Sequence, residues 1–307
     1  MATLTINAAD EKRVKAMGFL SNKGTDDFSG RGITVNGKIT AEQMQCIGEA
    51  AKLFGNGNVT FTTRLTVEVQ GIPFDRIPDF QAYIAKMGLV TGGTGRKVRP
   101  VVSCKGTTCQ YGLIDTFALS EEIHHRFFEG YADVTFPHKF KIAVGGCPNN
   151  CVKPDLNDLG VVGQHLKNFN ENLCKGCKKC RVLDACPMHA GEVKDGLLSV
   201  DSALCNNCGR CVGKCPFGAV TEGEAGYQIY IGGRWGKQTA MGRPLTKIFT
   251  DKEEVLQVIE KALQLFRDQG IDGERFATTV HRLGFENVEA QLLGDALPER
   301  KEAVIRS

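Results

Sequence analysis

The cysteines constrain the fold of this chain more than any other residue type. The 307-residue sequence contains 13 cysteines. Only Cys46 stands alone, and the other cysteines form three groups of four: Cys104, Cys109, Cys147 and Cys151, then Cys174, Cys177, Cys180 and Cys186, then Cys205, Cys208, Cys211 and Cys215. Four thiolates are the ligand set of a cubane 4Fe–4S cluster, so the grouping predicts three such clusters.

The remaining composition is that of an ordinary globular protein. Apolar residues make up 42% and charged residues 24%, and the length suits two modest domains or one domain with an insert. The net charge of +3 is small, so it predicts neither nucleic acid nor a membrane surface as a partner. Charges interrupt the first 20 residues and no stretch could span a bilayer, so we expect a cytoplasmic protein with reduced thiols.

Residues 1–90 have the pattern of a small α/β half-domain. Thr40 and Gln43 supply a capping-box signal for a helix over 41–54, whose expected inward stripe is Met44, Ile47, Ala51 and Phe54. Cys46 lies beside this stripe and is expected to be a buried, inert thiol. Strict alternation over 58–70 predicts one long strand, and a short helix is expected over 77–87.

A second unit is predicted from residues 91–166 together with 223–307. We expect strands near 101–103, 138–144, 158–163 and 227–231, and an amphipathic helix over 251–269 with its capping signal at Thr250 and Glu253. The intervening residues 167–222 are rich in Cys, Lys and Gly and hold few large apolar side chains. Such a segment cannot build a normal core and predicts an inserted module held together by metal clusters. The fold class is therefore α+β.

The insert carries the spacing C-x2-C-x2-C-x5-C-P followed by C-x2-C-x2-C-x3-C-P. In two-cluster ferredoxins, each close triplet takes its fourth ligand from the other motif. The pattern predicts one cluster on Cys174, Cys177, Cys180 and Cys215, and a second cluster on Cys186, Cys205, Cys208 and Cys211. Zinc is the alternative for C-x2-C pairs, and the crossed pattern with trailing prolines argues against it.

The third group of cysteines is a different kind of site. The pair Cys104 and Cys109 lies far along the chain from the pair Cys147 and Cys151. Two separate structural elements must therefore bring the thiols together. The spacing alone leaves zinc or an isolated iron–sulfur cluster open.

The segment Cys147-Pro148-Asn149-Asn150-Cys151, preceded by Cys104 and Cys109, resembles the cluster motif of sirohaem-dependent sulfite and nitrite reductases. The resemblance covers nearly the whole chain and implies that family's α/β sheets with an inserted ferredoxin module of two 4Fe–4S clusters. The insert points to the anaerobic, dissimilatory branch, and within it to the anaerobic sulfite reductases. The implied cofactors are sirohaem and three 4Fe–4S clusters, with Cys151 bridging cluster and sirohaem iron.

The resemblance also implies residues for the substrate and for sirohaem. The implied anion-binding residues are Arg31, Arg99, Lys139 and Lys141. The implied sirohaem contacts are Thr62, Arg64, Asn149, Gly233, Arg234 and Cys151. The chain departs from the family in three places: four residues separate Cys104 from Cys109 where five are common, Val35-Asn36-Gly37 replaces a Pro-Gly-Gly turn, and Gln70 stands where a histidine is frequent.

The function implied is the six-electron reduction of sulfite to sulfide, with electrons arriving through the ferredoxin insert. Nitrite reduction to ammonia is an alternative at the same centre, and a non-catalytic electron carrier with an empty or blocked sirohaem site is a second alternative. A suitable glycine fingerprint for a dinucleotide is absent from the sequence, so a flavoprotein or ferredoxin subunit is expected to supply the electrons. A homodimer or heteromer is expected, because two-repeat relatives divide the site between their halves.

Overall fold

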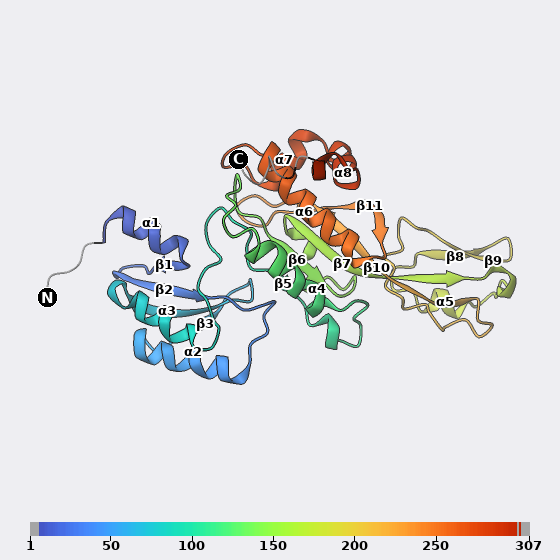
Figure 1. Ribbon diagram of the computed structural model, residues 1–307. Coiled ribbons are helices and arrows are strands. Elements are labelled where there is room, and N and C mark those ends of the chain that lie inside the picture. The colour runs from blue at the N-terminus through green and yellow to red at the C-terminus, as the bar shows by residue number, and fades with distance from the viewer. Residues whose placement is uncertain (1–5, 300, 302–307) are drawn as a thin grey trace.

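The structure, a computed structural model, describes residues 6–299 and residue 301. The chain forms an N-terminal unit, a central unit and a small module at the end of a long two-stranded arm (Figure 1). In the part of the chain that the structure describes, no helix is long and apolar enough to cross a membrane.

The N-terminal unit is an antiparallel sheet of four strands in the order β1-β2-β4-β3. Its strands are β1 (Phe19–Ser21), β2 (Asp27–Gly32), β3 (Val59–Phe61) and β4 (Val67–Pro73), and its helices are α1 (Ala8–Ala16), α2 (Ala41–Phe54) and α3 (Ile77–Ala85). Side chains of α2 and α3 join those of the sheet in one core that includes Phe19, Phe28, Ile47 and Phe80. Burial of these apolar side chains holds the unit together.

Helix α2 confirms the predicted capping box. The Thr40 side chain accepts a hydrogen bond from the Gln43 backbone, and the Gln43 side chain accepts one from Thr40. Cys46 is buried as expected, and burial raises the pKa of its thiol. The inward position expected for Met44 is wrong, because Met44 is 41% exposed while Ala50 is fully buried.

The single strand predicted over 58–70 is wrong, because the chain turns back on itself and forms the hairpin β3–β4. The Thr62 amide donates to the Thr66 carbonyl, and Leu65 adopts a left-handed φ of 59°. Val59 consequently pairs with Val69. The reversal leaves Phe61 exposed and buries Thr66. Apolar and polar side chains alternate along both strands of the hairpin, so the sequence pattern resembles that of one continuous strand.

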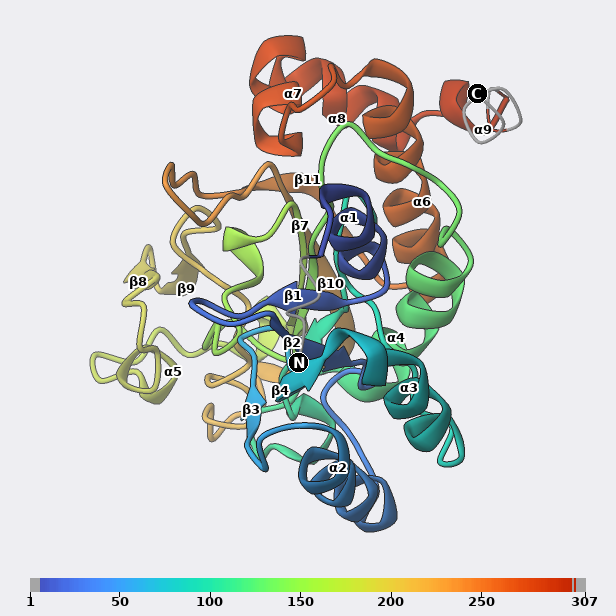
Figure 2. The same ribbon diagram turned by 90° about the vertical axis from the view of Figure 1, so that its left-hand side faces the viewer.

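The central unit is a mixed sheet of five strands in the order β11-β10-β7-β6-β5. Strands β5 (Val102–Ser103), β6 (Ile142–Gly145) and β7 (Leu159–Phe169) are parallel, whereas β10 (Val220–Ile231) and β11 (Arg243–Phe249) are antiparallel to their neighbours. Helices α4 (Thr116–Ile123) and α6 (Lys252–Gln269) pack beside each other on this sheet (Figure 2). The cap of α6 is Asp251 rather than Thr250, since the Asp251 side chain accepts from the Glu253 amide.

The C-terminal helices are α7 (Phe276–Leu283), α8 (Phe285–Leu293) and α9 (Ala296–Glu299), and they pack on α6.

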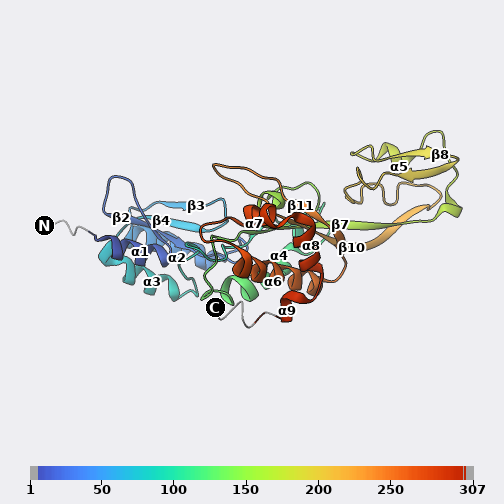
Figure 3. The same ribbon diagram turned by 90° about the horizontal axis from the view of Figure 1, so that it is seen from above.

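Strands β7 and β10 run on beyond the sheet as a two-stranded arm, paired from Leu159 with Ile231 to Phe169 with Val220. The arm carries the insert at its far end (Figure 3). The insert contains α5 (Arg181–Asp184), β8 (Gly191–Lys194) and β9 (Leu197–Val200). Its described apolar core comprises Val182, Leu198 and Val220, with cysteines packed against it.

Candidate functional site

The insert brings together the two crossed sets of cysteines that its spacing predicts. One pocket is lined by Cys174, Cys177, Cys180 and Cys215. A neighbouring pocket is lined by Cys186, Cys205, Cys208 and Cys211. Each set thus takes one ligand from the other motif. Over the described ranges, 6–299 and 301, no three His, Cys, Asp or Glu side chains converge closely enough to hold a single metal ion. Thiols that surround a pocket fit a cube of iron and sulfur better than one zinc ion.

The second insert set, which we call the proximal quartet (Cys186, Cys205, Cys208 and Cys211), sits against the arm. The His165 amide of β7 donates to the Asn207 carbonyl at 2.8 Å, and Gly209 packs against the His165 ring. Lys167 of the same strand places its Nζ 3.5 Å from the Cys205 Sγ. The first set (Cys174, Cys177, Cys180 and Cys215), the distal quartet, lies on the other part of the insert.

The third quartet forms where two parallel strands end. Cys104 follows β5 directly, and Cys147 follows β6 after one residue, Gly146. The Gly146 amide donates to the Cys104 Sγ at 3.1 Å. Burial raises the pKa of the Cys147 thiol, and Cys104, Cys151 and Cys109 are close enough to raise it further. The structure therefore gathers all four predicted thiols at one edge of the central sheet.

Close backbone contact holds the two cysteine loops together. A Cβ on Gly146 would lie 2.8 Å from the Gly106 Cα, and a Cβ on Gly106 would lie 2.6 Å from the Thr116 side chain. Thr116 in turn donates its hydroxyl proton to the Cys104 carbonyl at 2.8 Å. Neither loop can accept a side chain at these positions without moving its cysteines.

A Gly146→Ala substitution is therefore expected to displace the Cys147 loop and to lower iron and acid-labile sulfide by about a third, the share of one cluster in three. Gly48→Ala is the matched control, because a Cβ on Gly48 in α2 meets nothing within 4 Å. That control is expected to keep full iron content and to gain about 1 kcal/mol of helix stability. Equal iron content in both variants would contradict the described packing.

The predicted arginines Arg31 and Arg99 converge on one carbonyl. Both guanidinium groups donate to the Gly93 oxygen, at 3.2 Å and 2.5 Å. Arg31 is also paired with Glu68 at 2.7 Å, directly across the sheet between β2 and β4. The Arg99 Nε is buried without a hydrogen-bond partner among the described residues. Arg99 thus retains a donor for a ligand, whereas Arg31 is largely neutralised.

The predicted lysines Lys139 and Lys141 flank the fully buried Phe140, just before β6. The Lys141 amide donates to Asp158, and that buried carboxylate accepts two hydrogen bonds at 3.0 Å from Arg275. The Arg275 Nε has no partner in the described part of the chain. Sequence reasoning missed Arg275, because 117 positions separate it from Asp158 and no local pattern marks it.

Burial and mutual repulsion act on these cations together. Burial, with repulsion from Arg64 and Arg275, lowers the pKa of Lys141 to about 8. Burial lowers the pKa of Arg99 to about 10, and Arg31 and Arg275 contribute. The pKa of Lys139 is lowered by burial, Arg99, Arg275 and Arg234. Among the residues that the structure describes, Asp158 and Glu68 are the carboxylates that pair with this group, so the positive charge is in excess and an anion would relieve it.

Arg64 occupies the turn of the β3–β4 hairpin and joins the two units. Its guanidinium donates to the carbonyls of Pro100 and Ile142 and to the Asn157 side chain. Burial lowers its pKa to about 9. Thr62 shapes the same turn, because its hydroxyl accepts from the Arg64 amide and lies 2.7 Å from the Thr66 hydroxyl. These contacts position the hairpin, and direct binding of sirohaem by either residue stays a prediction.

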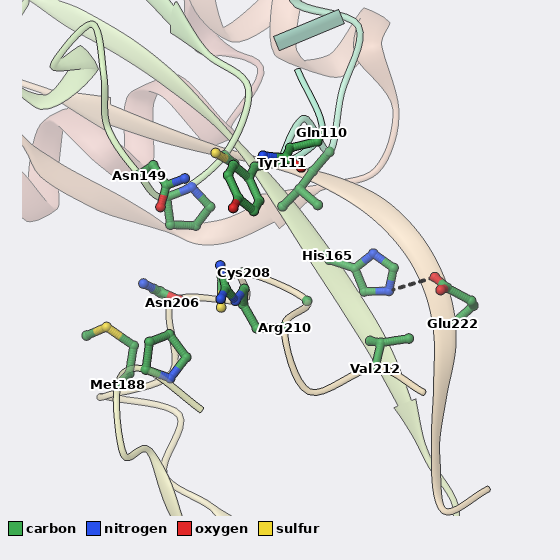
Figure 4. A pocket seen from close by; sticks show the side chains of 15 residues that line it. Gln110, Tyr111, Asn149, His165, Met188, Asn206, Cys208, Arg210, Val212 and Glu222 are labelled. Atoms are coloured by element: carbon green, nitrogen blue, oxygen red, sulfur yellow. Dashed lines mark ion pairs between the residues drawn. The ribbon is translucent and has the colours of Figure 1, made fainter. Parts of the chain in front are cut away.

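The other predicted cofactor contacts lie in two places. Gly233 sits where a Cβ would be 2.3 Å from the Asn157 carbonyl, so only glycine fits there. Arg234 follows it and lies close enough to Lys139 to lower that pKa. Asn149 instead lines a cavity of about 570 Å³ between the Cys147 loop and the insert (Figure 4). Cys151 is exposed, whereas the other three thiols of its quartet are half-buried.

The cavity in Figure 4 connects two cysteine sets. Cys147 lines it on the side of the central unit, and Cys208 of the proximal quartet lines it on the side of the insert. The Arg210 guanidinium lies over the Tyr111 ring across this gap, with its Cζ 5.5 Å from the ring centroid. The proximal quartet is therefore the insert set that faces the third quartet.

The fold and these sites together indicate an iron–sulfur oxidoreductase that has a partly buried cluster of cations in addition to its cysteine quartets. Residues 94–301 match the nitrite and sulphite reductase 4Fe-4S domain, and residues 22–87 match the nitrite/sulfite reductase ferredoxin-like half domain. The chain belongs to the nitrite and sulfite reductase family. That family is one of sirohaem and 4Fe–4S enzymes, which confirms the resemblance drawn from the motifs.

Proteins similar to this chain include sulfite reductases. The chain is 30% identical over 290 residues to the coenzyme F420-dependent sulfite reductase of Methanocaldococcus jannaschii, covering 90% of this chain and 45% of that protein. The chain thus spans less than half of that relative. It is 28% identical over 247 residues to one of the subunits of anaerobic sulfite reductase from Salmonella typhimurium, covering 73% and 69% of the two chains.

Two solved structures share the fold. Dissimilatory sulfite reductase I superposes with a TM-score of 0.69 at 23% identity, covering 89% of this chain and 70% of that chain. The NirA protein of Mycobacterium tuberculosis superposes with a TM-score of 0.65 at 17% identity, covering 94% and 47%. The predicted fold class is confirmed.

Proposed function

We propose that this chain is the catalytic subunit of an anaerobic, dissimilatory-type sulfite reductase that reduces sulfite to sulfide in the cytoplasm. The observation that carries the proposal is the excess of positive charge around the half-buried Lys139, Lys141 and Arg99 and the buried Arg275. Such a site favours a small oxyanion and a polycarboxylate cofactor over a neutral ligand. Sirohaem, when bound, supplies the iron on which sulfite is reduced.

The residues of this chain hold the substrate and move protons. Arg99, with its unpartnered Nε, would donate hydrogen bonds to a sulfite oxygen. The Lys141 and Lys139 ammonium groups would neutralise the oxyanion, and their lowered pKa values suit them to release a proton as an oxygen leaves as water. Asp158 and Arg275 would position Lys141, because Asp158 fixes the Lys141 backbone.

Three 4Fe–4S clusters would carry the electrons. The distal and proximal quartets each line a pocket of their own, and the third quartet would hold the cluster beside sirohaem. We infer that electrons pass from the distal to the proximal quartet and then across the shared cavity to the Cys147 loop. A relay suits a reaction that takes six electrons while each cluster delivers one at a time.

Two chains would complete each site. Lys141 precedes β6 and Cys147 follows it. Extended backbone covers roughly 20 Å between these positions, at about 3.3 Å per residue. One small anion cannot contact both ends of that strand. We therefore propose a two-fold dimer, or a heteromer with a similar subunit, in which the lysines of one chain face the cysteines of the other.

Viologen-driven turnover with sulfite and with nitrite, in parallel and with sulfide and ammonia quantified, tests the proposed activity. Faster sulfide formation supports a sulfite reductase, and faster ammonia formation would identify a nitrite reductase instead. If neither product forms in protein with full iron content, the chain is an electron carrier.

The rate constant kcat/KM for sulfite is expected to fall as pH rises above about 8. Lys141 is charged below its pKa of about 8 and becomes neutral above it, so its attraction for the anion is lost on the alkaline side. Lys141→Arg is expected to move this decline to higher pH, because a guanidinium stays charged. Sulfite ionises identically in both assays, so an unchanged alkaline limb in the variant would exclude Lys141 as its cause.

Lys167→Met is expected to lower the reduction potential of one insert cluster. The ammonium group lies 3.5 Å from the Cys205 Sγ, where positive charge stabilises the reduced cluster. Redox titration followed by electron paramagnetic resonance should show one insert signal moving to a more negative potential while the other stays in place. Lys194→Met, at the exposed end of β8, is the control and should move neither signal.

A further inference from the structure

Unpaired positive charge surrounds the distal quartet. In the loop from Cys174 to Arg181, the cysteines are interspersed with the cations Lys175, Lys178, Lys179 and Arg181. All four side chains are exposed, and none has an ion-pair or hydrogen-bond partner among the described residues. Surface cations elsewhere on the chain are frequently paired, as Lys247 is with Glu254 and Lys252 is with Glu122. The loop therefore presents charge that the protein itself leaves uncompensated.

The pocket of the distal quartet opens onto this same surface. Lys175, Lys179 and Arg181 line the pocket together with the four cysteines, and Phe217 completes its rim. Phe217 is 47% exposed, and Leu173, which directly precedes Cys174, is 41% exposed. A large apolar side chain beside unpaired charges is the composition of a contact surface for another protein.

The location of the surface also suits a partner. The insert projects from the rest of the chain at the end of the β7–β10 arm (Figures 1 and 3). The proximal quartet is seated against His165 of that arm and faces the Cys147 loop. The distal quartet is thus the set that a large partner can approach without contacting the central unit.

We propose that the surface formed by Lys175, Lys178, Lys179, Arg181 and Phe217 docks an acidic, one-electron redox protein of the ferredoxin type. This inference rests on the proposed direction of electron flow. Complementary charge would steer the partner, and the exposed ring would make the short-range contact next to the pocket. In each encounter the reduced partner loses one electron, and the oxidised distal cluster gains it.

The test measures reduction of the insert clusters by stopped-flow absorbance, with a photoreduced acidic two-cluster ferredoxin as probe and without sulfite. The triple variant Lys175→Gln, Lys178→Gln, Lys179→Gln is expected to lower the second-order rate constant at low ionic strength by about tenfold or more. The corresponding triple Lys→Arg variant is expected to keep the wild-type rate. A control triple, Lys12→Gln, Lys23→Gln, Lys52→Gln, removes the same charge from exposed sites on the N-terminal unit and should also keep it.

Two further measurements distinguish a lost docking surface from a damaged insert: reduction by methyl viologen, and the salt dependence of the ferredoxin rate. Iron content and reduction by methyl viologen should be unchanged in the Gln triple, because a small viologen needs no docking surface. The ferredoxin rate of the wild type should fall as salt is added, while the rate of the Gln triple stays flat. An unchanged ferredoxin rate in a fully loaded Gln triple, or a salt-independent wild type, overturns the proposal. Since sulfite is absent from this assay, failure of the proposed sulfite reduction would leave the docking result unaffected.

Discussion

A Cys151→Ser substitution is expected to abolish sulfite reduction while both insert clusters remain reducible. Cys151 belongs to the quartet at the end of β6, which lies outside the insert and its two pockets. Loss of one thiolate there should release or alter the cluster that we propose for this quartet, and with it the proposed electron transfer to sirohaem. Sulfide formation from reduced viologen measures the loss, and electron paramagnetic resonance of the reduced protein reports the two surviving clusters.

Cys46→Ala is the matched control for that experiment. Cys46 is buried on α2, and it belongs to none of the three quartets. Turnover in this variant should equal that of the wild type. If Cys151→Ser retained more than a few per cent of the wild-type sulfide formation, the proposed role of the third quartet would be wrong.

The double variant Lys139→Met, Lys141→Met is expected to lower kcat/KM for sulfite by about a thousandfold, from two lost oxyanion contacts of a hundredfold or less each. Methionine keeps the length and apolar stem of lysine and removes the charge. Iron content should stay near wild type, because the cysteine loops are at the other end of β6. Steady-state kinetics with viologen as donor measure the effect.

Mixing this lysine variant with Cys151→Ser tests whether two chains share a site. In a mixed dimer, one site would combine both lesions, and the other would combine intact lysines with intact cysteines. After refolding or co-expression in equal amounts, about a quarter of wild-type activity is expected, because half the dimers are mixed and half their sites are intact. Activity no greater than that of the separate variants would show that each chain forms its site alone.

Some of this molecule could be predicted from the sequence because the determining residues are close together along the chain. The capping box of α2 lies within four residues, and each cysteine triplet of the insert spans seven, so local spacing fixes both. Family membership followed from another short motif, the Cys147–Cys151 segment preceded by Cys104 and Cys109. The crossed cysteine sets also follow a general rule for two-cluster modules, which the two pockets match.

Other features depend on backbone geometry or on contacts between distant residues, which no local sequence pattern indicates. The β3–β4 hairpin was hidden because polar threonines continue the alternation through the turn, while the left-handed φ of Leu65 cannot be inferred from its side chain. The pairing of Arg31 with Glu68 follows from the register of β2 on β4. Arg275 joins the cationic centre only because α7 begins beside buried Asp158.

We propose that this chain provides a cationic, sirohaem-bearing site where sulfite accepts electrons from an iron–sulfur relay. The ratio of viologen oxidised to sulfide formed, measured anaerobically on purified protein with sulfite as the sole oxidant, tests it most directly. Six electrons should be consumed for each sulfide released. Viologen oxidation without sulfide, or no oxidation by protein that holds its full iron content, would show that the chain does not reduce sulfite to sulfide.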